Sequence, residues 1–310
     1  GINRHVLVQP STYGTDNRLM MESMAIFGLT HCRGVAVVDT QISDQALKDL
    51  HLAGVRGIRF NLAPPGATTL DMVRPLASRI ADLGWHVQVN APATLILQTR
   101  QTWTDLPVPV VFDHLGRVPQ PNALKHPLCH MILDLLQQGR AYVKLSGFYN
   151  ETAVGSPSYA DSVALTRRYA QEAPERVLWG SDWPHPTEAQ KGYPDDALLV
   201  DRLMEAVPDE AARQLLFVTN PAIQKAPCRC CIRQPVAALR AWLSCCLLLK
   251  NLTPVADRPR QCLRFHLLSL CLLHQVFGNL TDHLATNGMS TEVTAPALFA
   301  PALAIIVDLE

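Results

Sequence analysis

The clearest structural signal in the chain is the segment Val108-Pro109-Val110-Val111-Phe112-Asp113-His114-Leu115-Gly116-Arg117. Its first half is apolar, without the alternation of polar and apolar residues that marks a strand with one face in water. A continuous apolar strand is typical of a sheet that is buried on both faces, and such sheets are mostly parallel. Polar residues follow directly at its carboxyl end. The segment therefore predicts a buried parallel strand that delivers polar side chains to one edge of a sheet.

The first 223 residues repeat this pattern. Short apolar and β-branched runs predict strands at residues 5–9, 34–39, 55–60, 86–90, 108–113, 142–146 and 176–179. Amphipathic segments between them predict helices at residues 43–53, 70–83, 122–138, 161–173 and 209–217. Ser43 is suited to cap the first of these helices, because its hydroxyl can accept a hydrogen bond from a free backbone N–H. Strands and helices in alternation predict a parallel sheet covered by helices.

Two closures of such a sheet compete, an open doubly wound sheet and an eight-stranded barrel. A doubly wound nucleotide-binding fold has a Gly-rich turn after its first strand, whereas here Pro10-Ser11-Thr12-Tyr13-Gly14 follows. Polar residues instead occupy the ends of nearly all the strands, as in the active site of a barrel. These residues are Gln9, Ser11, Asp39, Arg59, Asn61, Asn90, Asp113, His114, Arg117, Lys144, Ser146 and Asp182. Seven strands are one short of a barrel, and the strand-like sequence just after Gly1 predicts that the first strand is the missing one.

Two motifs at strand ends carry residues that can do chemistry. Asp182, in Leu178-Trp179-Gly180-Ser181-Asp182-Trp183-Pro184-His185, can take a proton from water or bind a metal ion, and it can equally cap a helix. His114 can bind a metal ion, donate to a carbonyl oxygen or serve only as a hydrogen-bonding group in the core. A single such residue is more often structural, but two motifs at the ends of different strands favour a catalytic site.

Asp113-His114-Leu115-Gly116 together with Gly180-Ser181-Asp182-Trp183-Pro184 resembles the amidohydrolase-2 branch of the amidohydrolase superfamily. Val8-Gln9-Pro10-Ser11 and Gly57-Ile58-Arg59-Phe60-Asn61 narrow the resemblance to the 2-pyrone-4,6-dicarboxylate lactonase-like group. The resemblance covers residues 1–223. It implies an α/β fold, a distorted (β/α)8 TIM-like barrel lacking its first strand, that hydrolyses a C–O or C–N bond, often in a lactone. It also implies either no required cofactor or one divalent metal (Zn or Mn), because the lactonase group can dispense with the ion that some relatives use.

The resemblance assigns roles residue by residue. Asp182 would be the general base that activates water, and His114 would polarise the scissile carbonyl. Both residues would bind the metal if one is used. Arg117 and Arg59 would pair with a substrate carboxylate, and Ser11 would hydrogen-bond to the substrate. The structural alternatives are a solvated loop cation for Arg117 and an ion pair at the barrel rim for Arg59.

The chain departs from the family pattern in ways that bear on the substrate. It contains no His-x-His motif, and Leu62-Ala63-Pro64-Pro65-Gly66 stands where lactonases of the group carry basic residues. Asn90 takes the place of an aromatic hydroxyl and is expected to bind substrate. Lys144 either lines the mouth of the barrel or pairs with Asp182. Fewer cations imply fewer substrate carboxylates, so we expect a small carboxylated lactone, such as a sugar lactone, from aromatic or sugar-acid catabolism.

Two alternative functions stay open. Some members of the same family are metal-dependent decarboxylases. A chain without its first strand has two open sheet edges, whose unpaired backbone groups favour aggregation, so the chain is alternatively a catalytically inactive fragment.

Composition excludes other classes of protein. The chain has 27 Lys+Arg and 27 Asp+Glu, and its zero net charge provides no basic field for nucleic acid. No apolar run reaches the roughly 18 to 20 residues that span a membrane. No secretory signal is visible. We therefore expect a cytoplasmic protein without nucleic-acid or membrane partners, and its oligomeric state stays open.

The sequence changes character at Gln224. Residues 224–310 hold 17 Leu and seven of the nine Cys, and residues 224–256 contain no Asp or Glu. Cys228-x-Cys230-Cys231 lacks a second pair at zinc spacing. We expect residues 1–223 to form the barrel and residues 224–310 to be an anomalous Cys- and Leu-rich tail that is not a native domain. The competing interpretation is a pair of accessory or dimerisation helices.

Overall fold

The computed structural model describes residues 2–63, 66–224 and 304–309. They belong to one compact unit. The Cys-rich stretch between Cys228 and Cys271 lies outside the described residues, as does most of the predicted tail. The boundary at residue 223 between an enzyme domain and a tail therefore stays a prediction.

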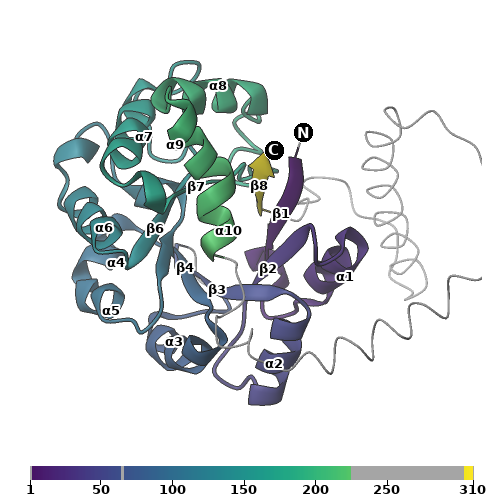
Figure 1. Cartoon of the computed structure of the whole chain (residues 1–310). Helices are drawn as coiled ribbons and strands as arrows, with labels where there is room; N and C mark the ends of the chain where they lie inside the picture. Colours follow the sequence, from purple (N-terminus) through teal and green to yellow (C-terminus); the bar gives the residue numbers. More distant parts are fainter. Residues whose placement is uncertain (1, 64–65, 225–303, 310) are drawn as a thin grey trace, which may run out of the picture. The chain divides into compact units, whose positions relative to one another are not determined.

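Seven parallel strands form the centre of the unit (Figure 1). Each pairs with the next in chain order. The strands are β1 (Ile2–Val8), β2 (Cys32–Ala36), β3 (Val55–Asn61), β4 (His86–Asn90), β5 (Val110–Phe112), β6 (Ala141–Leu145) and β7 (Val177–Trp179). All seven predicted strands are present. The parallel order, with helices around it, confirms the predicted barrel-type α/β fold with seven parallel strands.

An eighth strand, β8 (Ala304–Leu309), pairs with β1 in the antiparallel direction. Val6 lies opposite Ile306 and Val8 opposite Ala304, and the sheet ends at β7 on one side and at β8 on the other. The sequence predicted an open edge at β1, and for this edge the expectation was wrong. A strand from near the end of the chain supplies the backbone partners that an open edge would lack.

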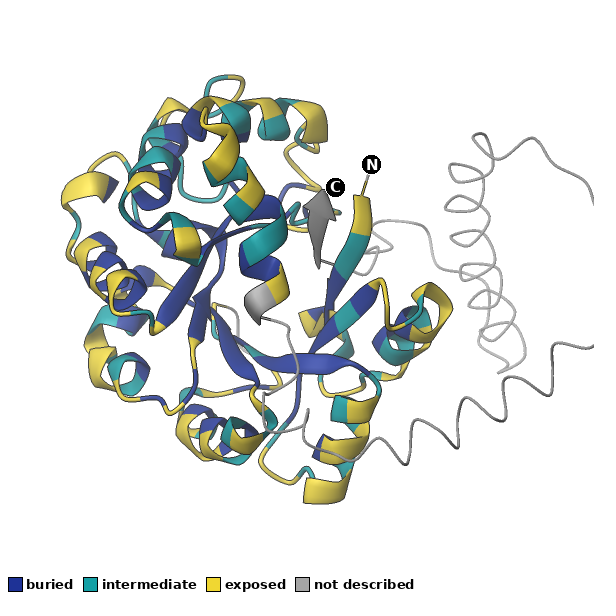
Figure 2. Ribbon diagram, in the orientation of Figure 1, coloured by how far each residue is buried: buried dark blue, intermediate teal, exposed yellow. Residues whose placement is uncertain are grey.

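Helices surround the strands, and their outer faces are exposed, whereas strands β2 to β7 and the second half of β1 are mostly buried (Figure 2). They are α1 (Arg18–Phe27), α2 (Asp44–Leu52), α3 (Val73–Ile80), α4 (Ala93–Gln98), α5 (Arg100–Thr104), α6 (Pro127–Gln137), α7 (Ala160–Glu172), α8 (Asp196–Ala206), α9 (Glu210–Gln214) and α10 (Asn220–Gln224). No helix in the described part of the chain has the length and apolar character needed to cross a membrane.

The helix predictions were only partly right. Ser43 caps α2 as expected, since its hydroxyl accepts a hydrogen bond from the N–H of Ala46 at 3.1 Å. The predicted helix at 122–138 instead begins at Pro127, where His126 is the cap and its ring nitrogen accepts from the N–H of Leu128. The predicted helix at 209–217 is α9 followed by a π-helical turn, Leu215–Thr219. Helices α1, α4, α5 and α8 were not predicted.

Both faces of the sheet are packed, as the apolar segment at β5 predicted. Val110 and Phe112 point into the large core cluster beneath the helices. Val111, between them, packs in a separate buried cluster with Tyr142 of β6 and Leu178 of β7. Full burial of one such side chain contributes about 1.5–3 kcal/mol. The strand ends are therefore held by packing on two sides, which gives the polar residues that follow them a rigid base.

Candidate active site

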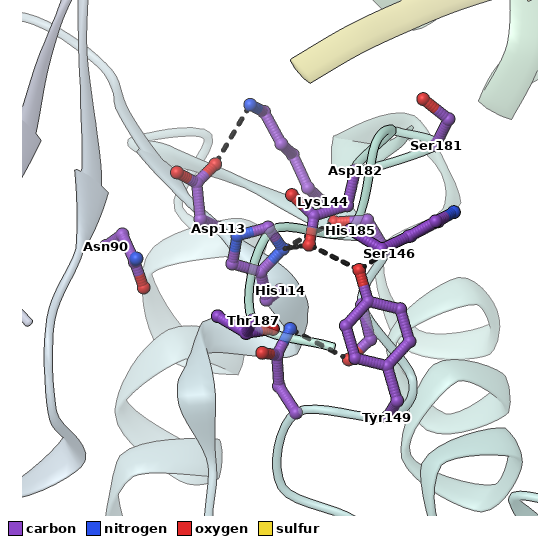
Figure 3. A network of polar contacts seen from close by, with 12 residues as sticks. Asn90, Asp113, His114, Lys144, Ser146, Tyr149, Ser181, Asp182, His185 and Thr187 are labelled. Carbon is purple, nitrogen blue, oxygen red and sulfur yellow. Dashed lines mark hydrogen bonds and ion pairs between the residues drawn. The ribbon is translucent and has the colours of Figure 1, made fainter. Parts of the chain in front are cut away.

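Polar side chains from six strand ends meet at one edge of the sheet, because the carboxyl ends of parallel strands lie together. Figure 3 shows the part of this cluster around Asp113, His114 and Asp182. The cluster has three connected parts: a buried ion group at Asp113, a hydrogen-bonded group at Asp182, and a polar rim at Arg117.

The buried ion group is centred on Asp113, the residue after β5. Lys144 Nζ lies 2.9 Å from Asp113 Oδ1, and Arg59 Nε lies 3.3 Å from Oδ2. Gln88 donates a further hydrogen bond of 3.1 Å to Oδ2. The carboxylate is 1% exposed, so it depends on these partners rather than on water. One carboxylate thus links strands β3, β4 and β6.

Charge, rather than solvent, sets the ionisation of this group. Burial alone would raise the pKa of Asp113, but Lys144 and then Arg59 outweigh it and hold the pKa well below its usual range. Burial lowers the pKa of Lys144, and Asp113 opposes that shift. Asp113 is therefore an ionised carboxylate whose charge is already compensated, which makes it a poor proton acceptor.

The second group joins His114 to Asp182. His114 Nδ1 lies 3.1 Å from Ser146 Oγ and 3.6 Å from Asp182 Oδ2. Tyr149 donates its hydroxyl to Asp182 Oδ2 at 2.7 Å. Burial lowers the pKa of His114, with Asp182 opposing the shift, while burial and then Asp182 raise the pKa of Tyr149. At neutral pH a neutral imidazole and a protonated phenol therefore stand beside the Asp182 carboxylate.

The Tyr149 hydroxyl also connects Asp182 to the protein behind it. His185 Nδ1 lies 2.9 Å from the same oxygen, and His185 Nε2 lies 3.1 Å from Asp196 Oδ1 at the start of α8. Tyr149 has one hydroxyl proton, so when it donates to Asp182 its oxygen can accept from His185. The carboxylate of Asp182 is held by a chain of three side chains.

Backbone conformations concentrate strain at this site. His114, Arg117, Asp182 and His185 have φ values of 48°, 54°, 58° and 59°, in the left-handed region that side-chain-bearing residues seldom adopt. Such residues cost on the order of 1–3 kcal/mol each and cluster at functional sites. Gly147 has φ 60°, and a Cβ there would clash with Asn150 and lie 2.9 Å from His114 Nδ1. Glycine at 147 therefore leaves room for the His114 ring.

The third group is a hydrogen-bonded rim along the strand ends. Ser11 accepts from Asn61 at 2.6 Å and from Arg59 at 3.3 Å. Asn90 donates to Asn61 at 3.1 Å and accepts from Arg117 at 3.4 Å. Arg117 ends the rim in an ion pair with Glu151.

The structure brings the predicted site residues together. Ser11, Arg59, Asn90 and Arg117 belong to the rim or its junction with Asp113, and His114 and Asp182 are neighbours. Arg59 forms an ion pair with Asp113, as its structural alternative expected, and its predicted contact with a substrate carboxylate stays a prediction. Arg117 is paired as well, so the alternative of a solvated cation was wrong for it. Lys144 is buried and pairs with Asp113, which is neither of the two interpretations offered for it.

Several neighbours of these residues were not predicted. His185 lies in the motif that supplied Asp182, and its place after Trp183-Pro184 was the available signal. Tyr149 and Glu151 come from the loop after β6, where the sequence gives no periodic pattern. Their contacts depend on how that loop folds back over the strand ends.

His114 and Asp182 are the residues that the sequence predicted to hold a metal ion if one is used. Within residues 2–63, 66–224 and 304–309, no three His, Cys, Asp or Glu side chains converge on a point where they would bind one. A zinc site normally needs at least three protein ligands. The donor set of the described residues therefore does not fit a metal ion without further ligands.

Comparisons with known proteins agree with the fold and identify the family. Residues 1–222 match the model of the Amidohydrolase family. A 2-pyrone-4,6-dicarboxylate hydrolase of Comamonas testosteroni is 36% identical over 231 residues, which are 71% of this chain and 75% of that enzyme. A D-galactarolactone isomerase of Agrobacterium fabrum is 30% identical over 222 residues, again 71% and 75% of the two chains.

A solved structure of a related protein has a similar fold. It is a probable 2-pyrone-4,6-dicarboxylic acid hydrolase of Acinetobacter baumannii with citric acid bound. The two chains are 27% identical, with a TM-score of 0.60 over 72% of this chain and 83% of the other.

Proposed function

This chain belongs to the amidohydrolase family, and from that premise we propose that it hydrolyses a small carboxylated lactone. The observation that carries the proposal is the contrast between two carboxylates at neighbouring strand ends. Asp113 is neutralised by two cations, whereas Asp182 is held by the neutral hydroxyl of Tyr149 and faces His114. A carboxylate whose charge is already compensated is a poor proton acceptor, so this difference favours Asp182 over Asp113 as the group that takes part in proton transfer.

Asp182 is the proposed general base. Tyr149 binds its Oδ2, which leaves Oδ1 as the oxygen that takes a proton from water. The water oxygen then forms a bond to the lactone carbonyl carbon, and the carbonyl oxygen becomes an oxyanion. A base in hydrogen-bonding reach of the water contributes about 10²–10⁴-fold to such a step.

His114 is proposed to stabilise that oxyanion. The lowered pKa of His114 keeps its ring neutral, so the ring carries one N–H. If the Ser146 hydroxyl donates a hydrogen bond to Nδ1, the ring proton of His114 lies on Nε2. Nε2 then donates a hydrogen bond to the carbonyl oxygen of the substrate. As the tetrahedral intermediate collapses, the ring C–O bond breaks and the leaving oxygen takes the proton held by Asp182. The products are an open-chain hydroxy acid, or its keto tautomer, and the regenerated carboxylate.

The rim is proposed to orient the substrate through Ser11, Asn90 and Arg117. These are neutral hydroxyl and amide groups and one paired cation. Such groups suit hydroxyls and a single carboxylate. The named relatives, a pyrone dicarboxylate hydrolase and a galactarolactone isomerase, act on lactone rings that carry carboxylates.

A divalent metal would act as a Lewis acid at the carbonyl in relatives that use one. The proposed steps use no metal ion, because the described residues bring only His114 and Asp182 to that point. The metal-dependent decarboxylase alternative has less support for the same reason. A cytoplasmic location and the lack of nucleic-acid partners stay predictions.

The test is lactone opening by the 310-residue chain, followed by NMR with a panel of sugar-acid lactones and pyrone carboxylates. We expect turnover of at least one lactone in the wild type, with the ring-opened hydroxy acid or its keto tautomer as product. Failure of the well-folded wild-type chain to open any of them would favour the inactive-fragment alternative. Carbon dioxide release would favour the decarboxylase.

A further inference from the structure

We propose that Glu151 sets the charge of the acid that this site accepts, by holding Arg117 in an ion pair so that lactones with at most one carboxylate are favoured over dicarboxylates. The inference rests on the proposed function, because it concerns the substrate of the same site. It assigns a specificity role to a residue that neither the sequence motifs nor the proposed mechanism uses.

The geometry of the pair is the first support. Arg117 Nε and Nη2 both lie 2.6 Å from Glu151 Oε1, so two of the guanidinium's donors converge on one carboxylate oxygen. Its Nη1 lies 3.4 Å from Asn90 Oδ1. Arg117 is 23% exposed and Glu151 31%, so both reach the mouth of the site. The planar fork that would grip a substrate carboxylate is already engaged from both sides.

The charge balance of the site is the second support. Its cations are Arg59, Lys144 and Arg117, and its anions are Asp113, Glu151 and Asp182. His114 adds no charge, because burial lowers its pKa. Apart from the His185–Asp196 pair behind Tyr149, the three positive charges among the described residues of the three groups thus face three negative ones. A monoanion meets little net repulsion here, whereas a dianion finds no uncompensated cation for its second carboxylate.

Glu151 is the anion that can be removed without touching the proposed chemistry. Asp113 is buried and links three strands, and Asp182 is the proposed base. Glu151 lies on the loop after β6 and contacts Arg117. Loss of its charge would leave Arg117 as an available cation next to Asn90. The site would then favour a second carboxylate.

The experiment measures binding rather than turnover, with isophthalate as a planar dicarboxylate probe and benzoate as its monocarboxylate match. Isothermal titration compares the wild-type chain with Glu151→Gln. We expect Glu151→Gln to bind isophthalate about tenfold more tightly, which is about 1.4 kcal/mol, and benzoate less than threefold more tightly. In the double variant Glu151→Gln/Arg117→Gln the gain should disappear.

Glu205→Gln is the matched control, since Glu205 forms a similar ion pair with Arg202 on the surface helix α8, at 2.7 Å. It should leave both affinities unchanged. If Glu151→Gln lowers the melting temperature, Glu151→Ser removes the same charge and provides the same comparison. The proposal is overturned if neither Glu151 variant gains isophthalate affinity, if both probes gain equally, or if the gain survives loss of Arg117.

Lactone turnover by the wild type is measured separately. A chain that shows the charge selectivity but opens no lactone would overturn the proposed function and leave the role of Glu151 standing. A chain that opens lactones but binds dicarboxylates as tightly as monocarboxylates would overturn the role of Glu151 alone.

Discussion

The carboxylate that follows β5 and the carboxylate that follows β7 are held by different kinds of partner. Asp113 is 1% exposed and lies between Lys144 and Arg59. Asp182 is 12% exposed, has a left-handed backbone, and accepts a hydrogen bond from the neutral Tyr149. A charge that is fully compensated stabilises the structure around it, whereas a charge held by a neutral donor stays available to a reacting proton. The strand-end position by itself therefore does not distinguish the two carboxylates, and the difference between their partners supports the proposal that Asp182 is the base.

The largest expected effect is the loss of unfolding free energy in Asp113→Asn. The amide keeps the shape of the side chain but leaves Lys144 and Arg59 buried without a carboxylate. Breaking a buried ion pair in this way costs about 3–5 kcal/mol of unfolding free energy. Urea unfolding followed by circular dichroism measures the loss.

Asp44→Asn provides the control for that measurement. Asp44 pairs with Arg79 at 2.6 Å, but its side chain is 81% exposed, so water replaces the lost partner. We expect little change in the unfolding midpoint. An equal loss in the two variants would mean that the group at Asp113 has no special structural role.

A smaller effect is expected from Tyr149→Phe, which removes the donor to Asp182 and leaves the ring in place. The carboxylate then loses its orientation relative to the water that it activates. We expect kcat to fall about tenfold or more with KM nearly unchanged, since hydrogen bonds to charged groups contribute about 1.5–3 kcal/mol. Steady-state kinetics tests this, with the exposed Tyr193→Phe as the control.

An unchanged kcat in Tyr149→Phe would contradict the role of Tyr149 in supporting the base. A rise in KM alone would place Tyr149 in substrate binding instead.

The pH dependence of the unfolding free energy provides a further test of the ion group at Asp113. The folded state lowers the pKa of Asp113, so its stabilising contribution is complete above the unfolded value of about 3.9 and is lost as pH falls below it. The difference in unfolding free energy between the wild type and Asp113→Asn should shrink by roughly 1 kcal/mol between pH 4 and pH 3, because the unfolded Asp113 becomes protonated over this range while the folded one stays ionised. Urea titrations at a series of pH values measure it. A difference that stays constant would contradict an ionised Asp113.

The sequence was informative where a pattern is local. Continuous apolar runs predicted all seven parallel strands, because burial on both faces leaves no polar alternation. The polar residues at their ends predicted the place of the site, since parallel strands carry them to one edge. Helices α4 and α5 were missed because they are short, six and five residues, and lack a side-chain cap.

The partners of the site residues could not be predicted in the same way. The pairing of Lys144 with Asp113 depends on the register between β5 and β6, which places Val143 beside Phe112. The contacts of Tyr149 and Glu151 depend on the loop after β6, which has no periodic signal. Strand β8 is separated from β1 by almost the whole chain, so nothing local indicates their pairing.

The most direct test of the account compares Asp182→Asn with Asp113→Asn in one experiment, by measuring lactone turnover and urea unfolding for each. We expect Asp182→Asn to lower kcat by at least about 100-fold while its unfolding midpoint stays near that of the wild type. Asp113→Asn should show a large loss of unfolding free energy. Retained turnover in a folded Asp182→Asn chain would contradict the assignment of Asp182 as the base.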